Sequence, residues 1–128
     1  MKKWSMGILL SLFLSACSNQ PKEEKKDSAV KAPSVMDNPD YDKGLSLVAK
    51  SDCFTCHKLR EQSVGPAYGA VAAKYESTEA NINMLADKVL KGGQGVWGAV
   101  PMAAHPNVSK EDAMQMVKYI LLLKEEKK

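Results

Sequence analysis

Two cysteines and a histidine lie together in the sequence Cys53-Phe54-Thr55-Cys56-His57. Two cysteines three positions apart in a tight turn can place both sulfur atoms against the two vinyl groups on one edge of a haem and form two thioether bonds. A histidine directly after the second cysteine then lies under the centre of the ring, where its imidazole can bind iron. The pentapeptide predicts covalent attachment of one haem c through Cys53 and Cys56, with His57 as an iron ligand.

The same cysteine spacing also occurs in redox-active thiol pairs and in zinc sites. A thioredoxin-like thiol pair requires a strand–helix–strand setting, whereas no alternating strand pattern appears in this sequence. A zinc site requires further ligands, and His105 is the only other histidine. We therefore favour haem attachment over both alternatives.

A second iron ligand must come from elsewhere in the chain. Met102 is the one methionine of seven that lies in an irregular Gly- and Pro-rich segment, residues 95–102, able to bring a thioether sulfur to a flat ring. It follows His57 by 45 residues, enough chain for two helices to pass around a haem edge. Three other methionines fall on predicted helical faces and are expected to pack in the core: Met84, Met114 and Met116.

Four segments have the apolar periodicity of helices, and these must position the ligands. The first begins with Asp40 as its N-cap and runs into the haem motif, with an apolar face formed by Tyr41, Gly44, Leu47 and Val48. The second spans about residues 67–75 and turns Val71 and Ala72 inward.

The third predicted helix spans residues 79–91, is ended by Gly92-Gly93, and has an apolar face formed by Ile82, Leu85, Val89 and Leu90. The fourth follows Ser109, with Asp112 approximating a capping box, and continues to about Lys124 with an apolar stripe formed by Ala113, Met116, Val117, Ile120 and Leu121. These elements predict an all-α domain of roughly 85 residues. Such a domain has little interior of its own to bury, so a haem would complete its core.

Three motifs follow one another along the chain: CFTCH at residues 53–57, GPAY at 65–68 and GQGVWGAVPM at 93–102. With the last helix, they resemble the class I cytochromes c over about residues 40–125. Within that class the chain is similar to the short bacterial monohaem carriers that serve nitrite reductases and terminal oxidases. The resemblance implies a small cytochrome c fold, with about four helices around one covalently bound haem c, and electron transfer rather than catalysis.

The resemblance also implies roles for three further residues. Pro66 corresponds to the proline whose carbonyl accepts the proton on the other ring nitrogen of the axial histidine. Trp97 corresponds to the indole that donates to a haem propionate, with a plain core position as the alternative. Lys88 would be another propionate partner, with a solvated position on the third helix as the alternative.

The chain departs from its short relatives directly after Met102. Relatives often continue with prolines and an asparagine that can hydrogen-bond the methionine sulfur, whereas this chain continues Ala103-Ala104-His105-Pro106. His105 is therefore expected near the methionine side of the haem, and we favour an ordinary surface position in the loop. The alternative is that it hydrogen-bonds near the ligand, or replaces Met102 at high pH or on mutation.

The N-terminus has the features of an export signal. Lys2 and Lys3 precede an uncharged apolar stretch, residues 4–16, that is too short to span a bilayer as a mature helix. The stretch ends in Leu-Ser-Ala before Cys17 and resembles the lipobox cut by the bacterial lipoprotein signal peptidase, with an ordinary secretory signal as the alternative. We predict a signal peptide at residues 1–16, lipidation of Cys17, and a membrane-anchored protein facing the periplasm or the cell exterior.

Charge and proline dominate residues 18–39, which predicts a flexible tether from 17 to 39 and a cytochrome domain from 40 to 128. Removal of residues 1–16 takes away two lysines and no acidic residue, so the net charge falls from +3 to +1. The mature chain therefore lacks the strongly basic character of nucleic-acid-binding proteins, and no nucleic acid partner is expected.

Ligation by one histidine and one methionine leaves iron no open position, so chemistry on a bound substrate is not expected. The sequence predicts a monohaem electron carrier between a respiratory donor, such as a quinol-oxidising complex, and a terminal oxidase or periplasmic reductase. Its encounters with these partners would be transient. Two alternatives stay open: a haem-based sensor in which Met102 leaves and a gas binds iron, and an electron-entry subunit of a larger redox enzyme.

Overall fold

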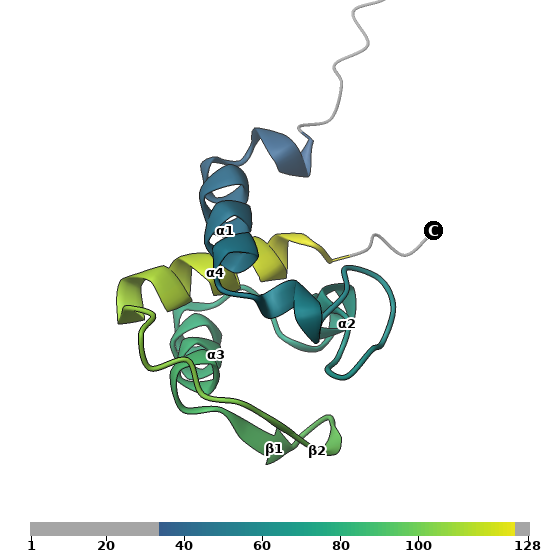
Figure 1. Cartoon of the computed structure of the whole chain (residues 1–128). Helices are drawn as coiled ribbons and strands as arrows, with labels where there is room; N and C mark the ends of the chain where they lie inside the picture. The colour runs from purple at the N-terminus through teal and green to yellow at the C-terminus, as the bar shows by residue number, and fades with distance from the viewer. Residues whose placement is uncertain (1–33, 125–128) are drawn as a thin grey trace, which may run out of the picture. The chain divides into compact units, whose positions relative to one another are not determined.

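The computed structural model describes residues 34–124. Within this range the chain forms four α-helices, α1 (Pro39–Lys50), α2 (Tyr68–Lys74), α3 (Glu79–Lys91) and α4 (Lys110–Leu122), and a hairpin of β1 (Gly93–Gly95) and β2 (Gly98–Met102) (Figure 1). Two short 3-10 turns, η1 (Val35–Asp37) and η2 (Cys53–Thr55), lie before and after α1. The prediction of a mainly helical domain with four helices is confirmed. The expected signal peptide, Cys17 and most of the expected tether lie outside the described residues.

α1 begins earlier than predicted, and its cap is Asn38 rather than Asp40. The side-chain oxygen of Asn38 accepts the N–H of Asp40 at 2.9 Å, and Pro39 occupies the first helical position. Asparagine is among the best N-caps, and proline suits the first position because an N–H there would have no helical partner. η1 precedes this cap and has its own capping box, formed by Ser34 and Asp37. Regular structure therefore begins before residue 40, inside the stretch expected to be a tether.

The other three helices lie close to their predicted bounds. α3 has the predicted bounds, with Thr78 as its side-chain cap and Gly92 after its last residue at φ +71°. α4 follows Ser109, whose hydroxyl accepts the N–H of Asp112 at 3.0 Å, and it ends at Leu122, slightly before the predicted end. α2 is one residue shorter at each end than predicted.

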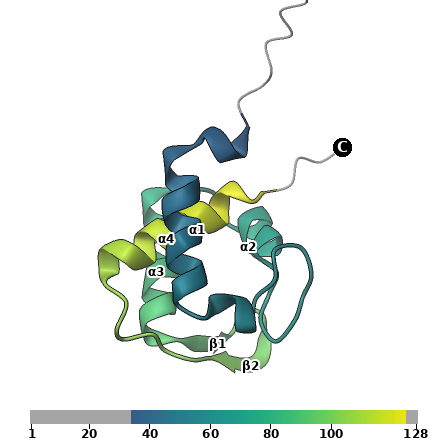
Figure 2. The same ribbon diagram turned by 45° about the horizontal axis from the view of Figure 1, so that its top comes forward.

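α4 lies at the centre of the fold and contacts each of the other helices, with α1 crossing it in Figure 2. Polar contacts link it to two of them. The side-chain amide of Gln115 donates to Oδ1 of Asp40 in α1 at 2.9 Å. The ammonium of Lys110 donates to Oδ1 of Asp87 in α3 at 2.6 Å. This hydrogen bond, and then a second one from Lys91, lowers the pKa of the Asp87 carboxyl below its usual range.

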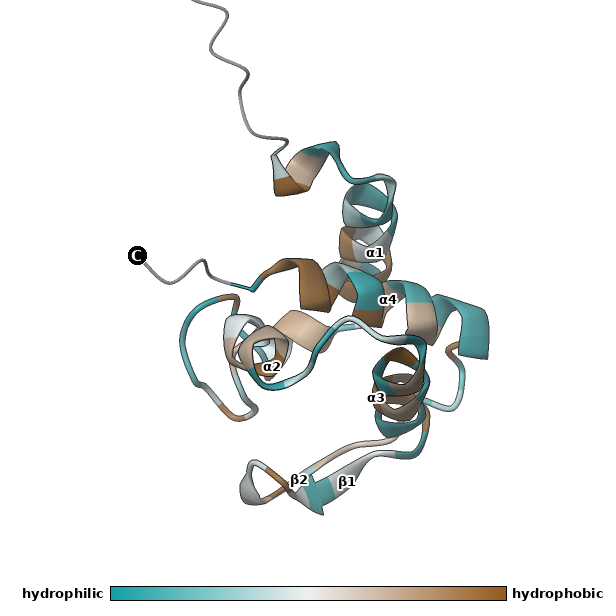
Figure 3. Ribbon diagram, turned by 180° about the vertical axis from the view of Figure 1, so that it is seen from behind, coloured by the Kyte–Doolittle hydropathy of each residue, from teal (hydrophilic) through white to brown (hydrophobic). Residues whose placement is uncertain are grey.

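The segment predicted to be an irregular loop, residues 95–102, instead forms most of the hairpin. β1 and β2 are antiparallel, with Gly95 opposite Gly98, so that Val96 and Trp97 form the turn. Gly95 and Gly98 have φ of +99° and +117°, a region that glycine adopts far more readily than other residues. The sequence does not predict these strands, because nearly all their residues are exposed and buried and exposed positions do not alternate along them. In Figures 1 and 3 the hairpin extends from the end of α3 toward the side on which α2 lies.

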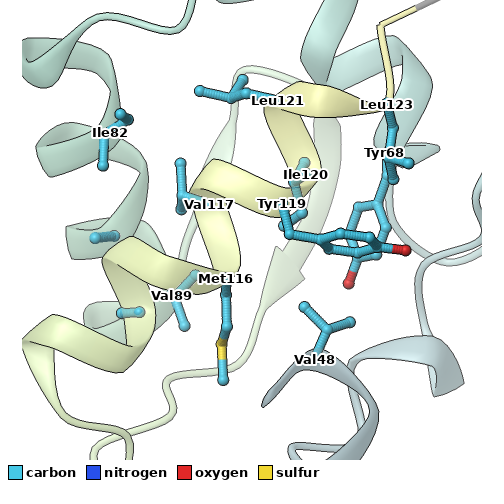
Figure 4. Close-up of a cluster of buried hydrophobic side chains, with 12 residues drawn as sticks. Val48, Tyr68, Ile82, Val89, Met116, Val117, Tyr119, Ile120, Leu121 and Leu123 are labelled. Atoms are coloured by element: carbon cyan, nitrogen blue, oxygen red, sulfur yellow. The ribbon is translucent and has the colours of Figure 1, made fainter. Parts of the chain in front are cut away.

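The hydrophobic core is built mainly on α4, as Figure 4 shows. Its predicted apolar stripe is buried at every position: Ala113, Met116, Val117, Ile120 and Leu121. Met116 is therefore a core residue as predicted, and Met114 packs against the core from its edge. Met84 is 38% exposed, so its predicted core position is wrong. It lies two positions after the buried Ile82, on the opposite side of α3.

None of the helices within residues 34–124 combines the length and the hydropathy of a membrane-spanning segment.

α1 and α4 approach each other most closely at Gly44. A β-carbon at this position would lie 2.7 Å from the backbone oxygen of Gln115 and would collide with the β-carbon of Tyr119. Beside this point the ring of Tyr41 meets Tyr119 edge-on, with 5.2 Å between the ring centroids. Glycine is therefore required at position 44 by the distance between the two helices.

We expect Gly44→Ala to lower the free energy of unfolding by about 1–3 kcal/mol, because the added methyl group overpacks the contact with α4. At an unhindered helical position the same change would raise stability by about 1 kcal/mol. Denaturant unfolding of the haem-loaded protein measures the effect. The control Ser46→Ala, at an exposed position of α1, should change stability by less than about 0.5 kcal/mol. Unchanged or increased stability of Gly44→Ala would contradict the close approach.

Candidate haem-binding site

The cysteine and histidine motif follows α1 directly and folds as a tight turn. Asp52 adopts a left-handed backbone conformation with φ +57°. The backbone oxygen of Cys53 accepts the N–H groups of Cys56 and His57 at 3.2 and 3.0 Å. Both cysteines are free thiols, with Cys53 half-buried and Cys56 exposed. The turn therefore brings the two thiols and the imidazole together over five residues.

His57 has one ring nitrogen engaged by the backbone. Its Nδ1 lies 2.8 Å from the carbonyl oxygen of Pro66. A carbonyl only accepts hydrogen bonds, so Nδ1 carries the proton. The opposite nitrogen, Nε2, therefore keeps the lone pair that binding to iron requires. Gly65 leaves room for the ring, since a β-carbon there would lie 2.5 Å from Cε1 of His57.

Tyr68 belongs to this site, although sequence reasoning gave it no role. Its ring stacks on that of His57, with 5.2 Å between centroids and 14° between planes. Its hydroxyl acts on the sulfur of Cys53 and lowers the pKa of that thiol, and the side chain is only 3% exposed. Tyr68 therefore touches one anchor cysteine and the histidine at the same time. The available signal was its position two residues after Pro66, at the start of a helix with an inward face.

Burial raises the pKa of both the Cys53 thiol and the Tyr68 hydroxyl. At Cys53, the hydrogen bond from Tyr68 opposes this effect on the pKa only in part. At Tyr68, burial raises the pKa well above its usual range. Before haem attachment both groups therefore stay protonated near neutral pH, and the tyrosine, which attachment does not modify, remains a donor.

Met102 ends β2, and the backbone beside it is tied to the end of α3. A β-carbon on Gly92 would collide with the backbone oxygen of Met102, so the two backbones run in close contact. The N–H of His105 donates to the carbonyl of Val89 in α3 at 3.1 Å. The Met102 side chain is half-buried and packs against the core. The segment that carries the predicted second ligand is thus anchored to α3.

The remaining predicted residues lie on or beside the hairpin. Trp97 is in its turn and is 42% exposed, so a plain core position is wrong. Lys88 is exposed on α3 and lays its side chain over the start of β1, since a β-carbon on Gly93 would lie 3.1 Å from its Nζ. His105 is half-buried, and its Nδ1 is buried without a hydrogen-bond partner among the described residues. It is therefore not a freely solvated surface histidine.

These residues fit a covalently attached haem. They comprise two free thiols on one turn, an imidazole whose unprotonated Nε2 can bind iron, and a methionine thioether on a separate segment anchored to α3. Soft sulfur and imidazole donors are those that haem iron accepts in c-type proteins. Within residues 34–124, no three His, Cys, Asp or Glu side chains lie close enough together to hold a metal ion by themselves.

Comparisons with known proteins agree with this chemistry. A family model described as cytochrome c matches residues 41–124. Cytochrome c-552 of Hydrogenobacter thermophilus is 44% identical over 78 residues, which cover 61% of this chain and 79% of that protein. Cytochrome c-551 of Allochromatium vinosum is 44% identical over 77 residues, covering 60% and 82%.

The fold has a close match among solved structures. The crystal structure of Nitrosomonas europaea cytochrome c552 superposes with a TM-score of 0.59 and 40% sequence identity, over 62% of this chain and 99% of that one. The match therefore includes nearly the whole of the other protein. The chain belongs to the cytochrome c family, as a class I monohaem cytochrome of the c-551/c-552 type that carries one covalent haem c and transfers electrons without being an enzyme.

Proposed function

We propose that this cytochrome is a lipid-anchored carrier that takes single electrons from a respiratory donor, such as a quinol-oxidising complex, and delivers them to a terminal oxidase or a periplasmic reductase. In this proposal Cys53 and Cys56 form the thioether bonds, and His57 and Met102 are the axial ligands. The haem, when bound, supplies an iron atom that gains and loses one electron. The observation that carries the proposal is the 2.8 Å contact between Nδ1 of His57 and the Pro66 carbonyl, because it leaves Nε2 as the ligating atom.

The protein's task is to keep both ligands in place in both oxidation states. The Pro66 carbonyl and the Tyr68 ring restrict rotation of the His57 imidazole. The ties between α3 and the segment after Met102 restrict the thioether. Fixed ligands limit reorganisation during electron transfer, and a methionine sulfur favours ferrous iron and so raises the reduction potential. Both effects suit a respiratory carrier.

Trp97 and Lys88 are proposed as donors to the haem propionates. Trp97 stands in the hairpin turn with 42% of its surface exposed, and Lys88 lies over the start of the same hairpin. An indole N–H and an ammonium are suitable donors to a carboxylate. Their shared position on the hairpin supports a common role.

Location and partners follow from the N-terminal sequence and the type of cytochrome. A small electron carrier of this type exchanges electrons with other redox proteins, in brief encounters that bury less than about 1,200 Å². Lipidation of Cys17 would hold the domain at a membrane that faces the periplasm or the cell exterior, and the charged stretch before Ser34 would let it reach its partners. Nucleic acid is not proposed as a partner, because the mature net charge is only +1 after removal of residues 1–16.

The sensor alternative requires Met102 to leave the iron so that a gas can bind. The anchoring of this segment to α3 favours a retained ligand, and hence the carrier. An electron-entry subunit would use the same ligands, and a catalytic chain that purifies with the cytochrome would favour that alternative.

We expect Met102→Ala to lower the reduction potential and to let the reduced protein bind carbon monoxide, because the sulfur ligand is lost and an iron position opens. Redox titration and optical spectra of the full haem-loaded chain measure both effects. Met84→Ala, at an exposed position of α3, is the control and should resemble the wild type. A Met102→Ala protein with the wild-type potential and no carbon monoxide binding would show that Met102 is not a ligand.

Two changes at Tyr68 separate its hydroxyl from its ring. Tyr68→Phe keeps the stack on His57 but removes a buried hydroxyl that interacts with the sulfur of Cys53, so we expect a loss of about 1 kcal/mol in the free energy of unfolding. Tyr68→Leu also removes the stack and should shift the NMR resonances of the haem methyl groups, because the imidazole can then rotate. Tyr75→Phe serves as the matched control. Wild-type resonances in Tyr68→Leu would mean that the stack does not orient His57.

Lipidation is tested by growing cells with an alkyne-tagged fatty acid and probing the purified cytochrome for the tag. The wild type should be labelled and Cys17→Ser should not, because the thiol that receives the lipid is gone. Ser18→Ala, which changes the neighbouring residue, should stay labelled. An unlabelled wild type, or equal labelling of Cys17→Ser, would contradict a lipid on Cys17 and favour an ordinary secretory signal.

A further inference from the structure

Lys74, the last residue of α2, has its ammonium group near two aromatic rings. Its ammonium nitrogen lies 5.7 Å from the centroid of the Trp97 ring and 5.8 Å from that of Tyr75. A cation over an aromatic ring is attracted at separations up to about 6 Å. Four of the other eight lysines of the described region contact carboxylates: Lys91, Lys110, Lys118 and Lys124. Within residues 34–124 Lys74 has no carboxylate at ion-pair distance, and the two rings are its neighbours.

The contact between Lys74 and Trp97 links α2 to the hairpin. Trp97 lies in the turn of the hairpin, whose strand residues are exposed from Gly93 to Pro101. In the proposed function the Trp97 indole also donates to a haem propionate, so the contact with Lys74 is a second restraint on the turn. β2 connects the turn directly to Met102, the proposed iron ligand.

α2 is a firm support for such a contact. Its Ala72 is fully buried, and its first residue, Tyr68, is 3% exposed and stacks on His57. The helix thus touches the histidine side of the site at one end and the hairpin at the other. In Figures 1 and 3 the free end of the hairpin lies on the same side of the molecule as α2.

We propose that Lys74 is a positioning residue that holds the hairpin turn against α2 through Trp97 and thereby keeps Met102 in place. This inference rests on the proposed ligation of iron by Met102. The positive charge of Lys74 is attracted to the Trp97 ring. Arginine can therefore replace lysine here, but an uncharged side chain of similar length cannot.

The test is competition between added imidazole and Met102 for ferric iron in the full haem-loaded chain, followed by loss of the weak red iron–sulfur band. We expect Lys74→Met to bind imidazole about two- to five-fold more tightly than the wild type. Lys74→Arg should behave as the wild type. The control Lys43→Met removes the same charge from an exposed position in the N-terminal half of α1, and it should leave the affinity unchanged.

Combining Lys74→Met with Trp97→Leu distinguishes a contact between the two side chains from a general effect of the lost charge. In a Trp97→Leu background, Lys74→Met should have no further effect on imidazole binding, whereas the same increase in both backgrounds would overturn the proposal. Amide hydrogen exchange is an independent readout: Lys74→Met should speed exchange in the hairpin and not in α4, and unchanged exchange would also overturn it. A wild type without the red band would contradict ligation by Met102 itself, whereas a normal band with unchanged imidazole affinity in Lys74→Met would contradict only the role of Lys74.

Discussion

The hydrogen bond from Nδ1 of His57 to the carbonyl of Pro66 is the contact on which the site depends. It fixes the tautomer of the imidazole, and so it decides which nitrogen can bind iron. The backbone makes it possible, because the N–H of Gly65 donates to the carbonyl of Cys56 at 2.9 Å and draws the intervening loop back to the cysteine turn. The stacked ring of Tyr68 then leaves the imidazole little freedom to rotate.

The two sides of the site are held in different ways. On the histidine side, buried side chains of α2 and the core fix the ligand, with Tyr68 as the main contact. On the methionine side, the hairpin is mostly exposed and Met102 is positioned by backbone contacts with the end of α3. The proposed methionine ligand is therefore held mainly through its backbone, whereas the proposed histidine ligand is held through buried side chains.

The sequence predicted those features that depend on local patterns. The bounds of α3 followed from its periodicity and from the glycines after it, and the burial of α4 followed from its stripe. The sequence predicts Asp40 as the cap of α1, whereas the cap is Asn38, because both residue types suit an N-cap and the backbone path decides between them. The hairpin has no alternation to detect, since its strands are exposed and rich in glycine. The stack of Tyr68 on His57 depends on how a loop returns to the cysteine turn, which no local pattern encodes.

In the proposed function the iron keeps one nitrogen ligand from His57 and one sulfur ligand from Met102 in both oxidation states. X-ray absorption at the iron edge, on the full haem-loaded chain in its ferric and ferrous forms, measures these neighbours. We expect one sulfur neighbour of the iron in each form, with almost the same iron–sulfur distance, because the fold holds the ligands and they do not rearrange. A spectrum without a sulfur neighbour in either form, or with sulfur in only one of them, would contradict the proposed ligation.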